Sequence, residues 1–398
     1  MSGPVVVAPA AFKGAVSASA AARAIAAGIL LAAPGTETRL VPVADGGEGT
    51  LDALVAARHG RTEGFTVADP LGRPVVAQIG LIPGETAVVE LARASGYERL
   101  TDTERDAEAT TTFGTGQLIR AALDFAPRRI IVTVGGSATN DGGLGLVRAL
   151  GGRLLTADGV ELEGRGTDLG AVATIDLTGL DPRLGTVAID VACDVRNPFH
   201  GRDGAAHVFG AQKGADTAAV ARLDRGLAAF AGVVMAQTGV DLQAIAGSGA
   251  AGGAAGGMAA LLGARIVPGA ELVLDAVGLA EALDGARLCI TGEGRLDEQT
   301  LRGKAPAAVA ALCRDLGVPC VGLCGELRLL PGLVRRMGMV AAFPIGRERV
   351  PLTDALAATE ADLAAMGASL GGLVAGLSST GKSETERLAD LVELLRGQ

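Results

Sequence analysis

The chain has 398 residues, of which 49% are hydrophobic and 20% charged; this balance excludes a disordered protein and suffices for two or three domains. Aromatic residues make up only 2%, and 35 Lys and Arg face 44 Asp and Glu, a net charge of −9, so a nucleic acid partner is disfavoured. No basic, apolar leader opens the chain, and the longest uncharged run, 242–264, is interrupted by polar residues and glycines. Neither secretion nor a membrane span is therefore expected.

The amino-terminal part alternates strand and helix. The sequence predicts a strand at 5–8, a helix capped by Ser17 and stopped before Pro34-Gly35, a strand at 38–43, and a helix capped by Thr50 and ended by Gly60. A strand-rich stretch follows, with a hairpin connection between 65–67 and 75–81 and further strands at 86–91, 130–134 and 186–192. Alternation then returns, with strands at 287–291, 319–323 and 339–344 and a helix at 307–316.

Alternation at both ends of the chain, around a different middle, predicts an α/β fold. We expect a discontinuous Rossmann-like parallel-sheet domain, residues 1–65 and 285–398, interrupted by an inserted second α/β domain with glycine-rich loops, residues 66–284. Parallel sheets bind ligands at the carboxyl ends of their strands, so the loops that follow the predicted strands are the candidate site.

The most informative loop, Gly-Gly-Ser-Ala-Thr-Asn-Asp-Gly-Gly at 135–143, follows the strand at 130–134 and precedes a helix expected from Leu144. Backbone N–H groups in front of a helix amino terminus favour an anion, most often phosphate, although a plain strand-to-helix turn has the same composition. Asp141 is a candidate Mg²⁺ ligand beside that phosphate. The candidate cofactor-binding residues of this loop are Gly135, Gly136, Ser137, Thr139, Asn140 and Gly142.

Two further loops place acids where strands end. Asp45 and Glu48 lie among glycines at the start of a helix, where simple matching of the helix dipole is the alternative explanation. Asp194 follows the strand at 186–192 as a candidate general base or metal ligand, and Arg196 and Asn197 suit a substrate carboxylate or hydroxyl. The alternative there is an Asn-Pro turn in which backbone N–H groups satisfy Asp194.

A fourth loop combines acids and bases after the strand at 287–291. Glu293 and Asp297 are candidate Mg²⁺ ligands, and Arg295 and Lys304 are placed to offset phosphate charge. Two more lysines are candidates. Lys13 follows the first strand and is positioned for the same ligand, and Lys213 is the weaker of the two; a solvated surface lysine is the alternative for both.

Two patterns are interpreted as carrying no chemistry. Segment 376–383 matches the P-loop pattern, but only fifteen residues follow Ser383, too few for the later strand with a Mg²⁺-binding Asp. Ser383 and Glu386 instead suit a capping box for a last helix through Leu395. Five cysteines without a C-x-x-C pair argue against a disulfide framework and against a zinc site, and favour a reducing cytoplasm: Cys193, Cys289, Cys313, Cys320 and Cys324.

With these loops assembled, the chain resembles the bacterial glycerate kinase family (type 1, ATP-dependent) from Val5 to about Ala375. The resemblance rests on ordered blocks spread along the chain: Phe12-Lys-Gly14, Ala44–Thr50, Thr110–Thr112 with Gly114 and Gly116, Gly135–Gly143, Ala192–Pro198, Gln212–Ala215, Thr291–Arg295, Asp297, Gln299 and Gly303-Lys304. Two departures stand out. Ala10 and Ala11 replace the Asp-Ser that the family usually has, and the tail beyond about Ser378 extends past the family's usual end.

The resemblance implies a two-domain α/β enzyme that phosphorylates glycerate with ATP and Mg²⁺, with the active site in the cleft between the domains. The product is expected to be 2-phosphoglycerate rather than 3-phosphoglycerate, and a homodimer is left open. From the loops and the resemblance together, we expect catalytic roles for Asp194, Asp45, Lys13 and Arg295; cofactor-binding for the loop residues above and Lys304; substrate-binding for Arg196, Asn197 and Glu48; and metal-binding for Asp141, Glu293 and Asp297. Because glycerate carries a carboxylate, at least one cation must face it, and Arg196 and Arg295 are the two candidates. The alternatives are a kinase of another small hydroxy acid, and a non-catalytic sensor of nucleotides or sugar phosphates.

Overall fold

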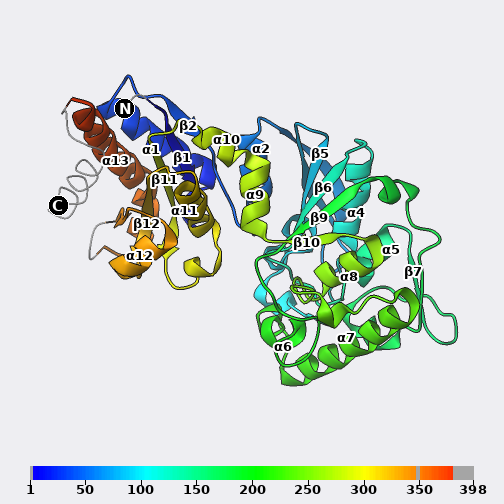
Figure 1. The fold of residues 1–398 in the computed structure, drawn as a ribbon. Helices are drawn as coiled ribbons and strands as arrows, with labels where there is room; N and C mark the ends of the chain where they lie inside the picture. The colour runs from blue at the N-terminus through cyan, green and yellow to red at the C-terminus, as the bar shows by residue number, and fades with distance from the viewer. Residues whose placement is uncertain (1–2, 347–349, 380–398) are drawn as a thin grey trace. The chain divides into compact units, whose positions relative to one another are not determined.

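The computed structural model describes residues 3–346 and 350–379 and divides into two compact units (Figure 1). Unit 1 comprises Met1–Asp45, Asp52–Arg58 and Val273–Gln398, and unit 2 comprises Gly46–Leu51 and His59–Leu272. Both ends of the chain thus belong to unit 1. The sequence-based domain division at 65/66 and 284/285 stays a prediction.

Unit 1 is built on a five-stranded, fully parallel sheet in the order β13-β12-β11-β1-β2. Its strands are β1 (Val5–Pro9), β2 (Thr38–Leu40), β11 (Leu288–Leu296), β12 (Cys320–Leu327) and β13 (Ala341–Pro344). Its helices are α1 (Ala18–Ala32), α10 (Leu279–Leu283), α11 (Ala305–Asp315), α12 (Pro331–Met337) and α13 (Leu352–Ser379), while α2 (Thr50–Ala57) and α9 (Gly269–Val277) each begin in unit 2. The predicted discontinuous parallel-sheet domain is confirmed.

Small residues let two helices of unit 1 pack closely. A Cβ added at Gly28 of α1 would lie 1.9 Å from the carbonyl oxygen of Ala364 in α13, and Gly367 approaches Ile25 in the same way. The alanine-rich sequence of α1 therefore serves close helix contact as well as helix propensity. Its predicted cap is confirmed, since the Ser17 hydroxyl accepts a hydrogen bond from the Ala20 N–H at 3.2 Å.

Unit 2 contains a six-stranded mixed sheet in the order β10-β9-β6-β5-β4-β3. Its strands are β3 (Arg61–Ala68), β4 (Pro74–Ile82), β5 (Thr86–Glu90), β6 (Arg129–Thr133), β9 (Ala188–Ala192) and β10 (Arg265–Val267), and β7 (Arg153–Leu155) pairs separately with β8 (Thr174–Asp176). The helices are α3 (Ala92–Ser95), α4 (Phe113–Leu123), α5 (Leu144–Ala149), α6 (Ala205–Phe209), α7 (Thr217–Thr238) and α8 (Ala254–Leu262). β3 and β4 form the predicted antiparallel hairpin, whereas β5, β6, β9 and β10 run parallel, so their carboxyl ends share one edge.

The structure corrects one predicted loop. β11 does not end at Thr291 but runs to Leu296, and Glu293 and Arg295 pair in register with Cys324 and Glu326 of β12. The glycines at 292 and 294 suggested a loop, but both lie within the strand, and Gly292 permits close strand packing: a Cβ there would lie 2.0 Å from the Leu323 carbonyl oxygen. Glu293 and Arg295 therefore lie in a paired strand of the sheet and not in a loop.

The P-loop-like segment is helical where it is described. Residues 376–379 form the end of α13, so the first half of the pattern lacks the loop conformation that cradles phosphates. Residues 380–383 and the proposed capping box of Ser383 and Glu386 lie outside the described residues.

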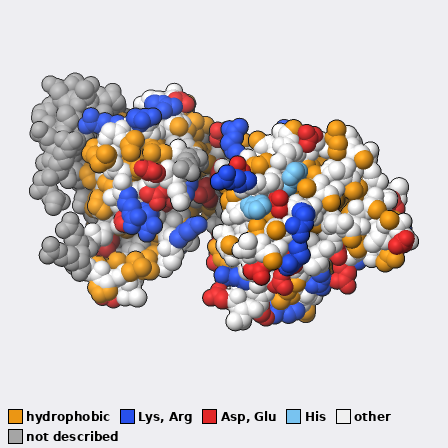
Figure 2. Space-filling model, turned by 90° about the horizontal axis from the view of Figure 1, so that it is seen from below, with side chains coloured by type: hydrophobic (Ala, Val, Ile, Leu, Met, Phe, Trp, Pro, Cys, Tyr) orange, Lys and Arg blue, Asp and Glu red, His pale blue; other side chains and the backbone are white. Residues whose placement is uncertain are grey.

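Two further observations concern the described helices and the surface of the molecule. None of the described helices is long and apolar enough to cross a membrane. On the face seen in Figure 2, basic, acidic and hydrophobic side chains are interspersed over both units.

Candidate active site

The loop at 135–143 is organised around the buried carboxylate of Asp141. One oxygen, Oδ2, accepts hydrogen bonds from the Thr112 N–H at 2.7 Å, the Thr112 hydroxyl at 2.8 Å and the Gly145 N–H at 3.3 Å. The other oxygen accepts from the Gly143 N–H at 3.1 Å. Burial raises the pKa of Asp141 above its ordinary value, and these four donors act in the opposite direction.

This arrangement changes two expectations about the loop. The N–H groups of Gly143 and Gly145, at the start of α5, bind the chain's own carboxylate, so this helix start offers no open phosphate site. Gly142 N–H is also used, because it donates to the Gly252 carbonyl oxygen at 2.9 Å. Asp141 is fully buried with both oxygens bonded, and this favours a structural anchor over the Mg²⁺ ligand that we expected.

Polar atoms without partners lie one residue before this anchor. Asn140 is fully buried, and neither its amide nitrogen nor its amide oxygen has a hydrogen-bond partner among the residues that the structure describes. The hydroxyls of Thr139 and Ser248 are likewise buried and have no hydrogen-bond partner among the described residues. Because an unbonded buried polar group costs about 1–3 kcal/mol, such a group is retained where a ligand or ordered water completes its bonding.

The backbone brings the segment after Ser248 onto the same loop. A Cβ at Gly252 would lie 2.1 Å from the Thr139 carbonyl oxygen and 2.4 Å from the Asn140 Cα, so only glycine permits this approach. The Gly/Ala-rich stretch at 247–257 therefore packs against the candidate ligand site.

Two glycines at the loop's beginning are needed for different reasons. A Cβ at Gly135 would lie 2.7 Å from the Gly47 Cα, so two glycine-rich loops touch here through their backbones. Gly136 has a φ of +72°, a left-handed conformation that favours glycine whatever the ligand. A bulky substitution at Gly136 would test backbone strain as much as phosphate access.

Lys213 lies beneath the loop and not on the surface. Its Nζ donates to the Ser137 hydroxyl at 2.8 Å and to the Thr139 carbonyl oxygen at 2.7 Å, and only 2% of the residue is exposed. Burial lowers the pKa of Lys213 to about 7, against the attraction of Asp141. The weaker of the two lysine candidates is therefore the buried residue that positions Ser137 and Thr139.

The lowered pKa of Lys213 predicts that the stability of the folded protein depends on pH. Because the pKa in the folded chain, about 7, lies below the value of the unfolded chain, the unfolded state binds more protons between the two and stability rises with pH there. We expect the free energy of unfolding to increase by about 1.5 kcal/mol from pH 7 to 8.5. Urea unfolding at a series of pH values measures this rise.

Two variants test whether Lys213 causes this pH dependence. Lys213→Met should remove the rise, because methionine does not titrate, whereas Lys13→Met should keep it, because Lys13 is exposed. A rise of the same size in Lys213→Met would show that another group is responsible.

Asp194 extends from the edge where the parallel strands of unit 2 end. Its Oδ1 accepts from the backbone N–H groups of Gly269 at 2.8 Å and Ala270 at 3.2 Å, at the start of α9. Backbone N–H groups therefore bind Asp194, as the alternative to a catalytic role expected. The side chain is nevertheless exposed at the loop surface, as is the neighbouring Arg196. Asn197 uses its amide Nδ2 to hold the Asp203 carbonyl oxygen at 2.8 Å, which fixes the turn that carries Arg196.

Sequence reasoning missed Glu90, the acid at the end of β5. It is 1% exposed, and its two oxygens accept from the N–H groups of Gly49 at 3.2 Å and Leu51 at 3.0 Å. Glu90 thereby supplies the helix cap that we expected from Thr50, whose hydroxyl instead donates to the Gly47 carbonyl oxygen. The signal was available, since Glu90 ends an apolar strand just as Asp194 follows one. The exposed Glu48 lies on the loop that Glu90 fixes.

In unit 1, the switch of direction in strand order falls between β1 and β11, which is where open parallel sheets bind ligands. Glu293 lies there, its Oε1 accepting from the Thr300 hydroxyl at 2.7 Å and its Oε2 lying 4.0 Å from Lys304 Nζ. Burial raises the pKa of Glu293, and the charges of Asp45 and Asp297 act in the same direction, whereas Thr300 and Lys304 lower it. The structure therefore brings together the acids at 45, 293 and 297 with one lysine.

The remaining cations of unit 1 differ in availability. Arg295 is paired on the surface with Glu326, Nε to Oε2 at 2.7 Å. Lys13 is exposed in the turn after β1, and its backbone lies beside Gly294 of β11, 3.5 Å from where a Cβ at that glycine would be. Lys13 is thus better placed than Arg295 to meet a ligand at the switch point.

Within the described part of the chain, the protein alone does not assemble an acidic cluster into a metal site. Among the residues that the structure describes, the one group of three or more possible ligands whose donor atoms all lie within 4.8 Å of one another is made of cysteines. The acids of unit 1 would thus supply only part of a coordination sphere, as is usual for Mg²⁺, which keeps waters and substrate oxygens among its ligands.

The fold and these loops define an α/β protein with a parallel-sheet unit built from both chain ends, carboxylates and lysines at or near strand ends, and buried side-chain polar atoms at Thr139 and Asn140 that have no partner among the described residues. The comparisons then show the family: residues 5–375 match the glycerate kinase family, and this chain belongs to it.

Relatives agree over nearly the whole length. The chain is 44% identical to the glycerate kinase of Bacillus subtilis strain 168, covering 88% of this chain and 92% of that one, and 43% identical to the glycerate 2-kinase of Escherichia coli K12, covering 86% and 90%. It superposes with a TM-score of 0.87 on the crystal structure of a protein described as glycerate kinase 2 from Salmonella typhimurium LT2, at 39% identity, covering 96% of this chain and all of that one. The α/β fold expected from the sequence is confirmed.

Proposed function

We propose that this protein is an ATP-dependent glycerate kinase that transfers a phosphoryl group to O2 of glycerate and so forms 2-phosphoglycerate. Membership of the glycerate kinase family carries this proposal, and the name of the E. coli relative, glycerate 2-kinase, favours O2 over O3. Phosphoryl transfer needs positioning and charge neutralisation more than a covalent nucleophile, and the strand-end loops carry residues of that kind.

Unit 2 supplies the groups that we assign to ligand positioning and proton transfer. The unpartnered amide of Asn140 and hydroxyl of Thr139 would bind polar groups of ATP, together with the N–H groups of Gly135 and Gly136, which donate to no acceptor within the described residues. Asp194 would accept the proton of the attacking hydroxyl, because its side chain is exposed in the loop after β9, as is that of Arg196 two residues later. Arg196 would pair with the carboxylate of glycerate.

Unit 1 supplies the groups that we assign to charge. Lys13 and Lys304 would offset phosphate charge, and Glu293, Asp297 and Asp45 are the oxygen donors suited to Mg²⁺. These donors fit this hard cation, since Mg²⁺ usually takes one or two carboxylates from a protein. Glu293 is partly exposed, and its two oxygens lie near the Thr300 hydroxyl and Lys304 Nζ. When bound, the ion would neutralise charge on the phosphates. Asp141 is not proposed for this role, because its oxygens are already bonded.

The decisive experiment identifies the product. Purified protein is incubated with ATP, Mg²⁺ and D-glycerate, and the phosphorus spectrum is recorded without proton decoupling. Phosphate on O2 is attached to a carbon with one hydrogen and gives a doublet, whereas phosphate on O3 is attached to a carbon with two and gives a triplet. We expect the doublet.

Each other result would point to a different function. A triplet would move the transfer to O3. Turnover with another small hydroxy acid, but not with glycerate, would replace the substrate. ATP binding by calorimetry without turnover of any hydroxy acid would indicate a non-catalytic sensor.

Two remaining expectations belong to this proposal. We propose a cytoplasmic location, which the five free cysteines support because a reducing compartment keeps thiols unpaired. A homodimer is tested by sedimentation of the full chain across a range of concentrations.

A further inference from the structure

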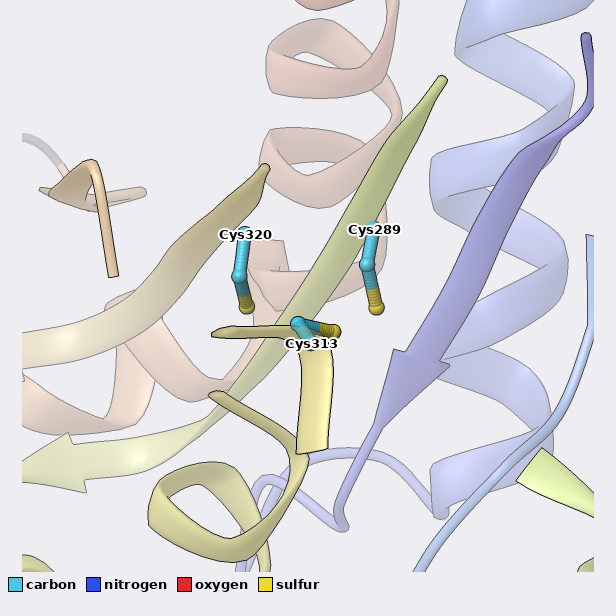
Figure 3. Close-up of side chains that lie close together, drawn as sticks. All are labelled: Cys289, Cys313 and Cys320. Carbon is cyan, nitrogen blue, oxygen red and sulfur yellow. The ribbon is translucent and has the colours of Figure 1, made fainter. Parts of the chain in front are cut away.

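Three of the five cysteines, separated in sequence, meet in the core of unit 1. Cys289 on β11 and Cys320 on the neighbouring β12 are in register, and Cys313 of α11 faces them (Figure 3). The three sulfur atoms lie within 4.8 Å of one another, and each residue is fully buried. The sequence argued against a metal site because no C-x-x-C pair is present, but that argument covers only ligands close together along the chain.

A disulfide is a poor explanation for this cluster. Cys289 and Cys320 lie side by side on parallel strands, which are about 4.8 Å apart, whereas a disulfide brings the two Cβ atoms to about 3.8 Å. All three thiols are free in the structure. By contrast, three sulfurs bound about 2.3 Å from one central ion lie about 4 Å apart, so only a small inward movement is needed to close the cluster around an ion.

The surroundings restrict which ion can bind. The cluster is fully buried, and the group of close ligand atoms found among the described residues consists of three sulfurs, one fewer than the tetrahedral sphere that Zn²⁺ prefers. Three thiolates would leave a complex of charge −1 with Zn²⁺ and −2 with Cu⁺, and buried net charge is costly.

We propose that Cys289, Cys313 and Cys320 form a binding site for a soft, three-coordinate trivalent metalloid ion, with arsenite as its probe. Trivalent arsenic bound to three thiolates is neutral and pyramidal and needs no fourth ligand. Arsenous acid is itself uncharged at neutral pH, which favours its entry into an apolar core. This site is independent of the proposed kinase activity.

The binding step balances without any oxidant or reductant. Each thiol gives its proton to one hydroxyl of arsenous acid, which leaves as water, while a sulfur–arsenic bond replaces the oxygen–arsenic bond. One molecule of arsenous acid and three thiols thus give one tris-thiolate and three waters.

The test uses the full chain, reduced and freed of small thiols, with sodium arsenite. Native mass spectrometry should show one arsenic gained and three hydrogens lost per chain. X-ray absorption at the arsenic edge should show three sulfur neighbours and no oxygen. Cys313→Ser should lose three-sulfur coordination and bind arsenite at least 10-fold more weakly. Cys324→Ser, which replaces another buried cysteine of β12 outside the cluster, should bind as the wild type does.

The absorption measurement needs no variant and so tests the proposal even where Cys313→Ser folds poorly. Two sulfurs and one oxygen around arsenic would overturn it, as would equal uptake by folded Cys313→Ser. Stoichiometric Zn²⁺ or Cu⁺ bound at these three cysteines more tightly than arsenite would also overturn it, because charge would then not select the ion.

Discussion

Asn140→Leu should weaken ATP binding by about 10- to 150-fold, which corresponds to the 1.5–3 kcal/mol of a hydrogen bond to a charged group, without lowering stability. The reason is the unpartnered state of the Asn140 amide among the described residues. If ATP completes its bonding, leucine removes a ligand contact and also removes the cost of a buried, unbonded amide. We expect the free energy of unfolding to stay the same or rise by about 1–3 kcal/mol.

Calorimetry with ATP and urea unfolding measure the two effects of the Asn140 change. Thr133→Val is the matched control, because the Thr133 hydroxyl is also buried and unpartnered within the described chain but belongs to β6, below the loop. The control should bind ATP normally. Asn140→Ala guards against crowding by the larger leucine. Wild-type ATP affinity in both Asn140 variants would exclude the amide from the ligand site, and a strongly destabilised Asn140→Ala would assign it a structural role.

Asp194→Asn should lower kcat by about 10² or more, as removal of a general base does. The structure makes this substitution selective for charge. Asparagine retains the oxygen that accepts from the Gly269 and Ala270 N–H groups, so the start of α9 keeps its cap and stability should change by less than about 1 kcal/mol.

A second acidic cap provides the control for Asp194. Asp216 caps α7 by accepting from the Ala219 N–H at 2.7 Å, and Asp216→Asn should leave kcat unchanged. The Mg²⁺ dependence of residual Asp194→Asn activity then separates two roles. An unchanged Mg²⁺ requirement indicates the base, and a strongly raised one indicates a metal ligand. Near-normal turnover would contradict both roles and make Asp45 the candidate base.

Local sequence patterns predicted most of the elements in this fold. The Ser17 cap, the hairpin of β3 and β4, and the parallel strands at both chain ends follow from capping residues, hydrophobic runs and turn residues, which act over a few positions. The prediction for β11 was wrong in length, because Gly292 and Gly294 read as a loop when only the chain is considered. In the folded chain both glycines lie in a strand paired with β12, and at Gly292 the neighbouring backbone is so close that a side chain would not fit.

The order of residues along the chain was also enough to locate the loops that carry polar residues and to indicate the family. Which of these polar groups already have hydrogen-bond partners depends on the folded chain. Asp141 is bonded by Thr112, 29 residues away, and Ser137 is held by Lys213, 76 residues away, while Asn140 between them has no partner in the described chain. The same holds for Cys289, Cys313 and Cys320, which no local spacing relates. Hydrogen bonds and metal ligands depend on distances of a few ångströms in space, and only the packed sheets and helices set those distances.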